Sequence, residues 1–384
     1  MFTWRSDPAR CSAGRLSENP RIPGKDVGKP ASNTGYTMNL RLLHLPVVAA
    51  ATLVLVSGCS PARDSGPVNQ KSRTSPAYTV TVLDSLASGA PHPTCINDNG
   101  EVVGSISIAD EESYPVLWIG HSLTKLPCPI GRPWGEAASI NTTGDIIGYA
   151  YSDWGKTHLG GDYRAVLWHD GQVSELPMPR NYRLSRGIAI NDRGDVLCSL
   201  GEIPTPFHSC LRSKGHEWTL EGAAFGLSQD GAVVGFANDA YGRAHACVWT
   251  DGRPEAQDPL PGCRTSSADS INATGDIAGE CNSGQAFIRT SSGAAFITTA
   301  DTPWAIAEGM NDKREIVGLG RHKQGSEVSY PFLWRDGKIL DLNQAIPADS
   351  GFVIGSALGI NNRGQIIVTG TFRGTDAAAV LTPS

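Results

Sequence analysis

One short stretch recurs seven times in this chain and sets what the chain can fold into. Each copy has an apolar residue, then Asn, two polar residues, Gly and a run of valines or isoleucines, and the clearest copy covers residues 96–104. Two apolar runs separated by polar residues and a glycine are typical of a β-hairpin, because glycine reaches positive φ without a steric penalty. The copies are marked by six asparagines and one serine: Asn97, Asn141, Asn191, Ser228, Asn272, Asn311 and Asn361.

The Asn has a local role in this turn. Its side-chain carbonyl can accept a hydrogen bond from the backbone two residues on, and Ser228 keeps that option in the fourth copy. In the sixth copy Arg314 stands where the others have the turn glycine. A non-glycine residue in the left-handed region costs about 1 kcal/mol, so we expect this hairpin to be looser or differently turned.

The spacing of the copies predicts the architecture. The seven marker residues lie 44, 50, 37, 44, 39 and 50 residues apart, and a mean of 44 is the length of one four-stranded propeller blade. The last copy ends after its third strand, while residues 78–83 alternate as a half-buried strand and belong to no complete copy. The sequence therefore predicts an all-β fold, a seven-bladed β-propeller of four-stranded blades that is closed by the N-terminal strand pairing into the last blade.

Composition agrees with one repeat domain and argues against one class of partner. The chain has 44 Gly and 25 Pro among 384 residues, as expected of many short strands joined by turns. Beyond residue 58 it carries 25 Lys and Arg against 35 Asp and Glu, a net charge of −10 without basic clusters. This excludes nucleic acid as the expected partner, and we expect a monomer.

The first 76 residues divide into three segments. Residues 1–37 are polar and lack an apolar pattern, which predicts a disordered or misannotated extension. In residues 38–58 a charge at Arg41 precedes an apolar run of signal-peptide length, so we expect a secretory signal. Residues 59–76 are expected to form a flexible tether, and residues 77–384 the propeller.

The end of that apolar run, residues 56–59, resembles the lipobox of bacterial lipoproteins. The resemblance implies that cleavage leaves Cys59 as a lipid-carrying N-terminus, and Ser60 in place of Asp then implies the outer membrane. The periplasmic and the surface face both stay open. The alternative is an ordinary cleaved signal or an uncleaved anchor.

The repeats themselves resemble the HAF-type repeats of bacterial extracellular proteins. Those units run Ile-Asn-x-x-Gly-Gln-Val-Val-Gly, then Ala-Phe-Leu-Trp, and residues 341–383 look like the usual last unit. The resemblance covers residues 77–384 and implies an extracellular β-propeller, but no catalytic residues. Three residues depart from the pattern: Arg212 and Arg289 replace Trp, and Cys198 replaces Gly, which puts the regularity of the third and fifth units in question.

Cysteines are the first candidate for chemistry. In an exported protein, Cys198 could pair with Cys210 across a hairpin, and Cys263 with Cys281. The alternative for each pair is two small buried residues. Neither a metal site nor a cofactor is expected, because no CxxC spacing and no third ligand for His208 and His245 is found.

A long connection between a second and a third strand is the candidate binding loop. Residues 149–164 hold unrepeated aromatic and polar side chains, and such loops share one rim of a propeller. The alternative is a solvated insertion. The candidate ligand-binding residues are Tyr151, Asp153, Trp154, His158 and Tyr163.

Two functions follow from these patterns. The first is a lipid-anchored cell-envelope propeller that binds a protein or a glycan as a scaffold module. The alternative is an extracellular carbohydrate-active hydrolase or lyase on the same scaffold. Nothing in the sequence favours catalysis, since it shows no Ser-His-Asp order, phosphate loop or metal cluster. Two or three ionisable residues from different blades, meeting at the channel mouth, would favour the enzyme.

Overall fold

The computed structural model describes residues 77–86, 89–109, 112–152, 162–201, 208–256, 260–322 and 328–384. All of them belong to one unit of the chain, residues 62–384. The expected extension, signal segment, lipid-bearing Cys59 and tether lie outside the described residues.

The described residues form an all-β structure of four-stranded antiparallel repeats, as the sequence predicts. We number the repeat units 1 to 7 by their turn residues. Unit 1 contains β2 (Ala90–Ile96), β3 (Glu101–Ala109), β4 (Glu112–Ile119) and β5 (Ser122–Lys125); unit 2 contains β6 (Trp134–Ile140), β7 (Ile146–Tyr151), β8 (Arg164–His169) and β9 (Gln172–Glu175). Unit 3 contains β10 (Leu184–Ile190), β11 (Val196–Gly201), β12 (His208–Ser213) and β13 (His216–Glu221); unit 4 contains β14 (Ala223–Leu227), β15 (Val233–Asn238), β16 (Ala244–Thr250) and β17 (Arg253–Ala256).

The remaining strands complete units 5 to 7. Unit 5 contains β18 (Ser266–Ile271), β19 (Ile277–Cys281), β20 (Gln285–Thr290) and β21 (Gly293–Phe296); unit 6 contains β22 (Trp304–Met310), β23 (Ile316–Arg321), β24 (Ser329–Arg335) and β25 (Lys338–Asp341). Unit 7 contains β26 (Phe352–Ile360), β27 (Ile366–Phe372) and β28 (Thr375–Pro383), and a short 3-10 turn η1 (Leu342–Gln344) precedes it. Its fourth strand is β1 (Tyr78–Val82), which pairs antiparallel with β28 from Tyr78 opposite Pro383 to Val82 opposite Ala379.

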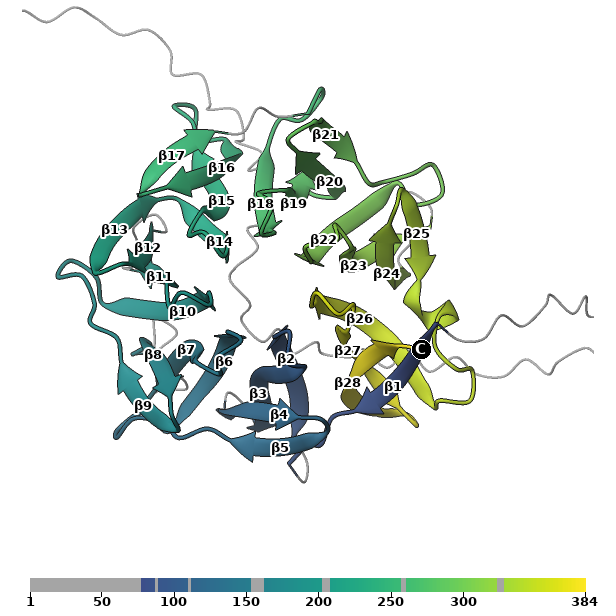
Figure 1. The fold of residues 1–384 in the computed structure, drawn as a ribbon, viewed down its shortest axis with the longest axis horizontal. Coiled ribbons are helices and arrows are strands. Elements are labelled where there is room, and N and C mark those ends of the chain that lie inside the picture. Colours follow the sequence, from purple (N-terminus) through teal and green to yellow (C-terminus); the bar gives the residue numbers. More distant parts are fainter. Residues whose placement is uncertain are drawn as a thin grey trace, which may run out of the picture. The chain divides into compact units, whose positions relative to one another are not determined.

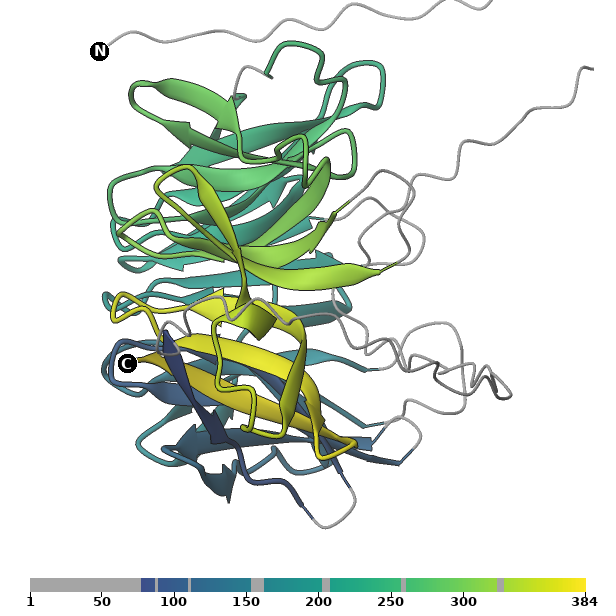
Figure 2. The same cartoon turned by 90° about the vertical axis from the view of Figure 1, so that its right-hand side faces the viewer.

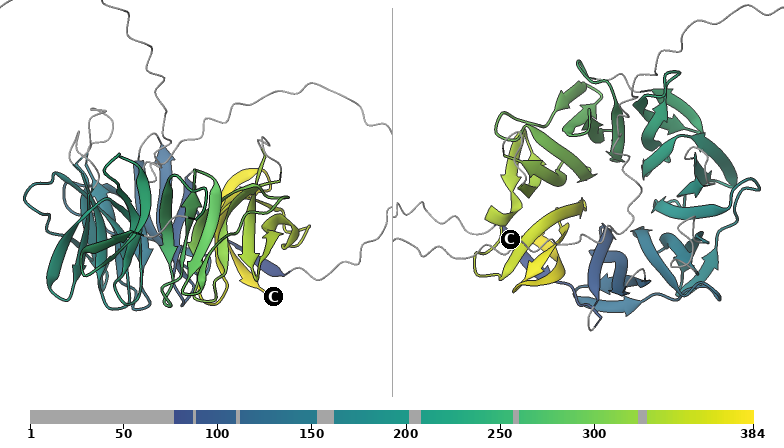
Figure 3. Two further views of the ribbon diagram at one scale, coloured as in Figure 1. Left: turned by 90° about the horizontal axis from the view of Figure 1, so that it is seen from above. Right: turned by 180° about the vertical axis from the view of Figure 1, so that it is seen from behind.

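The units surround a common axis, with the first strand of each unit innermost (Figure 1). Side views show the strands running mostly along this axis (Figures 2 and 3). Because neighbouring strands are antiparallel, the Asn turns gather at one end of the axis, and the second strands end and the third strands begin at the other. We call these the turn end and the loop end.

Sheet boundaries differ from the prediction in one place. Among the described residues, five sheets have four strands, but units 5 and 6 share one eight-stranded sheet. A single parallel pair, Gln285 with Ala305, joins them, and the Ala305 N–H donates to the Gly284 carbonyl at 3.0 Å. A Cβ on Gly284 would lie 2.2 Å from the Trp304 ring, so this glycine allows the close approach of the two units.

Each innermost strand carries a β-bulge three residues or so before its turn. In units 1, 2, 4, 5 and 6 a glycine on the second strand faces the bulge; a Cβ on Gly104, for example, would lie 2.1 Å from the His92 carbonyl oxygen. In unit 3 the glycine has changed strands, because Gly187 faces Cys198. The bulge is therefore kept, and the departure at Cys198 leaves the unit regular.

The expectation of a looser turn at Arg314 is wrong. Arg314 adopts φ +63° and makes the same turn as its glycine counterparts, with its N–H donating to the Asn311 carbonyl at 3.0 Å. Its Nε also donates to Oδ2 of buried Asp276 in unit 5 at 2.7 Å. This ion pair between units accounts for a side chain where the backbone favours glycine.

The arginine in place of tryptophan in unit 3 performs the same task as the tryptophan. The indole N–H groups of Trp118 and Trp168 donate to the carbonyls of Asp84 and Pro127 in the preceding units, at 2.8 Å and 2.6 Å. Arg212 donates from Nη2 to the corresponding Pro177 carbonyl. The regularity of unit 3 is thus preserved by a different donor.

The two cysteine pairs behave differently. Cys263 and Cys281 form a disulfide that ties the segment before β18 to the end of β19. Cys198 and Cys210 face each other on β11 and β12, but both are buried free thiols. Burial raises the pKa of Cys198 to about 12 and that of Cys210 to about 11, which keeps both in the unreactive neutral form.

Candidate functional site

The turn end is built from the amide groups of the recurrent asparagines. In unit 1, Oδ1 of Asn97 accepts from the N–H groups of Asn99 and Glu101, at 3.0 Å and 2.9 Å. Its Nδ2 donates to the Glu101 carboxylate at 2.6 Å and to the Asn141 carbonyl of unit 2 at 2.9 Å. All four hydrogen-bonding positions of the amide are used, which explains why Asn97 can be 5% exposed at no net cost.

The same donation links successive units. The Nδ2 group of one turn Asn donates to the main-chain carbonyl of the next turn residue, at 2.9 to 3.2 Å. We call this series the amide relay. It runs from Asn311 to Asn361, from Asn361 to Asn97, and onward through Asn141 and Asn191 to Ser228.

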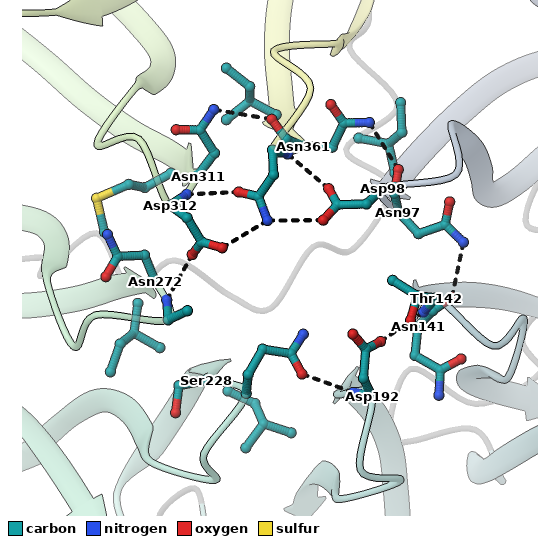
Figure 4. A pocket seen from close by; sticks show the side chains of 18 of the residues that line it. Asn97, Asp98, Asn141, Thr142, Asp192, Ser228, Asn272, Asn311, Asp312 and Asn361 are labelled. Atoms are coloured by element: carbon teal, nitrogen blue, oxygen red, sulfur yellow. Dashed lines mark hydrogen bonds between the residues drawn. The ribbon is translucent and has the colours of Figure 1, made fainter.

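A second series, the side-chain relay, lies one residue further along each turn (Figure 4). Here the main-chain N–H of one unit donates to the side chain of the next unit. The donor and acceptor pairs, all at 2.8 to 3.0 Å, are Thr142 with Asp192, Asp192 with Gln229, Ala273 with Asp312, Asp312 with Asn362, and Asn362 with Asp98.

These turns enclose a cavity of about 170 Å³ on the axis, lined by residues of all seven units. Three carboxylates from three units reach it: Asp98, Asp192 and Asp312. Each one accepts a main-chain N–H of the preceding unit, and Asp98 and Asp312 also accept from Nδ2 of Asn362. The carboxylates that an enzyme could use here are engaged in holding units together.

One junction lacks both relays in the described part of the chain. Ser228 has no amide to donate to unit 5, and its hydroxyl instead contacts Asp230 and the Ala232 carbonyl of its own turn. Ala273 has no side-chain acceptor for the Gln229 N–H. Units 4 and 5 are therefore joined at the turn end by packing alone.

At the loop end, the structure places only part of the predicted binding loop. Tyr151 and Tyr163 are 5% and 3% exposed and pack with Tyr149. The ring centre of Tyr163 lies 5.5 Å from that of Tyr151 and 5.6 Å from that of Tyr149. Both side chains are buried in this cluster, whereas the sequence suggested that they would contact a ligand. Asp153, Trp154 and His158 lie outside the described residues.

Beside this tyrosine cluster lie two charged residues that the sequence patterns did not single out. Arg186 on β10 places its guanidinium carbon 4.0 Å from the ring centre of Tyr163 and 4.9 Å from that of Tyr149. Glu136 on β6 accepts from the Ser105 hydroxyl of unit 1 at 3.4 Å.

A positional signal for these residues is present in the sequence. His92, Glu136 and Arg186 each stand five residues before the turn Asn of successive units, where the other four units have Ala, Ser or Ile. Three ionisable side chains therefore occupy one level of three neighbouring innermost strands.

Burial controls the protonation of this group. Burial raises the pKa of Glu136 to about 7, although Arg186 and the Ser105 hydroxyl act in the opposite direction. Burial, with the Glu136 charge second, raises the pKa of Tyr149 well above its ordinary value. The pKa of His92 is lowered by burial, opposed by Asp376. The Glu136 carboxyl thus exchanges its proton near neutral pH.

Within the described residues, no three His, Cys, Asp or Glu side chains converge as metal ligands. No helix in that part of the chain is long and apolar enough to span a membrane.

No family model matches this chain. The chain is 32% identical over 98 residues to the large ribosomal subunit protein uL4 of Fervidobacterium nodosum; the matched part is 23% of this chain and 42% of that protein. The chain therefore spans less than half of this relative's length.

Three similar solved structures are β-propeller and related proteins. The β-propeller domain of the Trilobed protease from Pyrococcus furiosus has a TM-score of 0.46 at 14% identity, covering 66% of this chain and 81% of that one. YCF48 from Cyanidioschyzon merolae has a TM-score of 0.45 at 10% sequence identity, covering 80% of this chain and 98% of that one. TolB from Acinetobacter baumannii has a TM-score of 0.40 at 13% sequence identity, covering 79% of this chain and 96% of that one. All three TM-scores are below 0.5, so these similarities carry no inference about the site.

The junction between units 4 and 5 can be strengthened. In Ala273→Asn, the new side-chain oxygen is placed to accept the Gln229 N–H, as Oδ1 of Asn362 accepts the Asp312 N–H. We expect the free energy of unfolding, measured in urea, to rise by about 1 kcal/mol. Ala273→Leu has nearly the same shape without an acceptor and is the control. Equal stability of the two variants would contradict the role given to the side-chain relay.

The pKa of Glu136 predicts a pH dependence of stability. Because the folded-state pKa is about 7 and the ordinary value 4.5, the folded state binds more protons between them, and stability falls as pH rises through this window. Relative to Glu136→Gln, the wild type should lose on the order of 2 kcal/mol of unfolding free energy between about pH 5 and about pH 8, partial exposure included.

The difference between the two proteins cancels other titrating groups such as His92. Glu112→Gln, which removes an exposed carboxylate of unit 1, should keep the pH dependence of the wild type. Parallel stability curves for the wild type and Glu136→Gln would show that Glu136 titrates at its ordinary value.

Proposed function

We propose that this chain is a seven-bladed β-propeller, closed by its own N-terminal strand, that serves as a lipid-anchored binding module of the cell envelope for a protein or a glycan. Closure is supported by two links between the ends of the chain: β1 pairs with β28, and Asn361 donates to the Asn97 carbonyl. Units 5 and 6 count as two blades because, among the described residues, Gln285 with Ala305 is the one strand pairing between their strands.

The observation that carries the binding function is the difference between the two ends of the axis. At the turn end, Asp98, Asp192 and Asp312 accept hydrogen bonds that join units, so the cavity there serves architecture. At the loop end, charged and aromatic side chains are unrepeated, and they differ from unit to unit. Unrepeated side chains on a rigid scaffold are where binding is usually located.

A second function is favoured by His92, Glu136 and Arg186, ionisable residues of three units that stand at one level of the innermost strands, and by the near-neutral pKa of Glu136. A carboxyl that exchanges its proton at this pH suits general acid or base catalysis, as in a glycoside hydrolase or lyase. A glycoside hydrolase also requires a second catalytic carboxylate nearby, and the residues around Glu136 supply Arg186 and tyrosines instead. Binding is therefore the better-supported function.

Binding is tested with the purified mature chain on a glycan array and in a pull-down from envelope extract. We expect a ligand from one of the two, and its loss in the double variant Trp154→Ala, His158→Ala in the connection between β7 and β8. Lys214→Ala, which alters an exposed turn at the opposite end, is the control and should bind as the wild type does. The absence of any specific ligand in both assays would overturn the proposal.

The lipid anchor rests on the lipobox-like residues before Cys59 and has its own test. In a bacterial host, the precursor of Cys59→Ala should stay unprocessed by the lipoprotein signal peptidase, because that enzyme cleaves before a lipid-modified Cys. Cys11→Ala, which changes the cysteine upstream of the apolar run, should be processed normally. Normal processing and membrane fractionation of Cys59→Ala would sink the anchor.

A further inference from the structure

Arg186 is a positive charge held in place without a hydrogen-bond acceptor. Its guanidinium lies over Tyr163 and Tyr149, and the side chain is half-buried. In the described part of the chain, no carboxylate, carbonyl or hydroxyl oxygen accepts a hydrogen bond from it. A guanidinium has five N–H donors in a rigid planar fork, so all of its directional binding capacity is open to a ligand.

The tyrosines hold this guanidinium in position. Tyr149 and Tyr163 are 8% and 3% exposed and pack against each other, so their rings form a fixed support beneath the cation. Tyr151 joins the same cluster, and its hydroxyl lies 2.9 Å from the Ser113 hydroxyl of unit 1. A side chain restrained in this way loses little conformational entropy when it binds an anion.

The neighbouring charges restrict which anion can bind. Glu136 is close enough for its charge and that of Arg186 to interact, yet the two form no ion pair. A carboxylate beside the guanidinium repels a dianion such as phosphate more strongly than a monoanion. When protonated, Glu136 can instead donate a hydrogen bond to a second carboxylate.

We propose that Arg186, supported by Tyr149 and Tyr163 and flanked by Glu136, binds the carboxylate of an acidic sugar of the uronic acid class at the axis of this protein. This deepens the binding function proposed above and rests on it. The guanidinium fork matches the two oxygens of one planar carboxylate. The remaining polar groups at the same level, Glu136 and His92, are suited to sugar hydroxyls.

A sugar fits better than an acidic peptide. The mature chain carries a net charge of −10, which disfavours a partner with several negative charges, while a uronic acid residue carries one. The site also offers one cation among uncharged or proton-exchanging groups, a mixture that matches one carboxylate surrounded by hydroxyls.

Binding is expected to weaken as pH rises. Glu136 is surrounded by Arg186, Tyr149, Tyr151 and the Ser105 hydroxyl. His92, on the innermost strand of the preceding unit, interacts with the charge of Asp376. Of the groups around the ligand carboxylate, Glu136 gains its negative charge near neutral pH, and that charge then opposes the ligand's. Affinity should therefore be greater at about pH 6 than at about pH 8.

The test is calorimetric titration of the mature chain with D-glucuronic acid at both pH values. We expect Arg186→Gln to weaken binding at least about tenfold. Arg186→Lys keeps the charge without the fork, so its affinity should lie between those of the wild type and Arg186→Gln. Arg180→Gln, which removes an exposed arginine of the preceding connection, is the matched control and should bind as the wild type does. Thermal unfolding of each variant shows whether the fold is kept, and Arg186→Lys carries the test if Arg186→Gln unfolds.

Three control ligands define the class: D-glucose has no carboxylate, inorganic phosphate is mainly a dianion at the higher of the two pH values, and a short acetylated glutamate peptide is not a sugar. Equal binding of any of them, or glucuronate binding that Arg186→Gln leaves unchanged, overturns the assignment. If glucuronate does not bind while the array or pull-down finds another ligand, this inference is wrong and the proposed function stands. If all of these assays fail, both fall.

Discussion

The structure depends on one small group, the carboxamide of the turn Asn. In Asn97 its oxygen closes the hairpin by accepting two main-chain N–H groups, and its nitrogen reaches both its own unit and the next. A single side chain thus sets the turn of one unit and the position of its neighbour. Because the group is buried, each of these bonds is needed: an amide left with one free donor there would be destabilising.

This double role explains the acidic residue that often follows the turn glycine. Glu101, Asp145, Asp195 and Asp276 accept the second N–H of the amide in their own units. They orient the amide, and in units 1 to 3 its other N–H points across the junction. At Asp276, burial acts to raise the pKa, but hydrogen bonds from Arg314, Thr274 and Asn272 outweigh it and keep the pKa lowered.

Much of the fold could be predicted from the sequence, because turn chemistry and strand alternation are local. Patterns within about 50 residues predict where each unit begins and where its third strand lies. The incomplete last copy predicts that residues 78–82 pair with the last unit. What could not be predicted comes from contacts between units. Arg314 looked like a defect because its partner Asp276 lies in another unit, and Arg212 because the Pro177 carbonyl does.

The site was less predictable for the same reason. Tyr151 and Tyr163 stood out as unrepeated aromatics, but alternation alone does not tell which unrepeated side chains are covered by neighbouring strands. Arg186 and Glu136 are ordinary charged residues on strands, and their significance comes from packing across two junctions. Aligning the units on their turn residues would have shown the three ionisable residues at one level, since that comparison uses spacing only.

A ring has no natural end, so its weakest point need not coincide with the ends of the chain. In the closed ring proposed above, β1 is hydrogen-bonded to β28 along its whole length, whereas the junction after Ser228 has neither relay at the turn end. Thermal opening is then expected to begin between units 4 and 5, with β1 and β28 still paired. The strand pairing that closes the ring is then more stable than the junction between units 4 and 5.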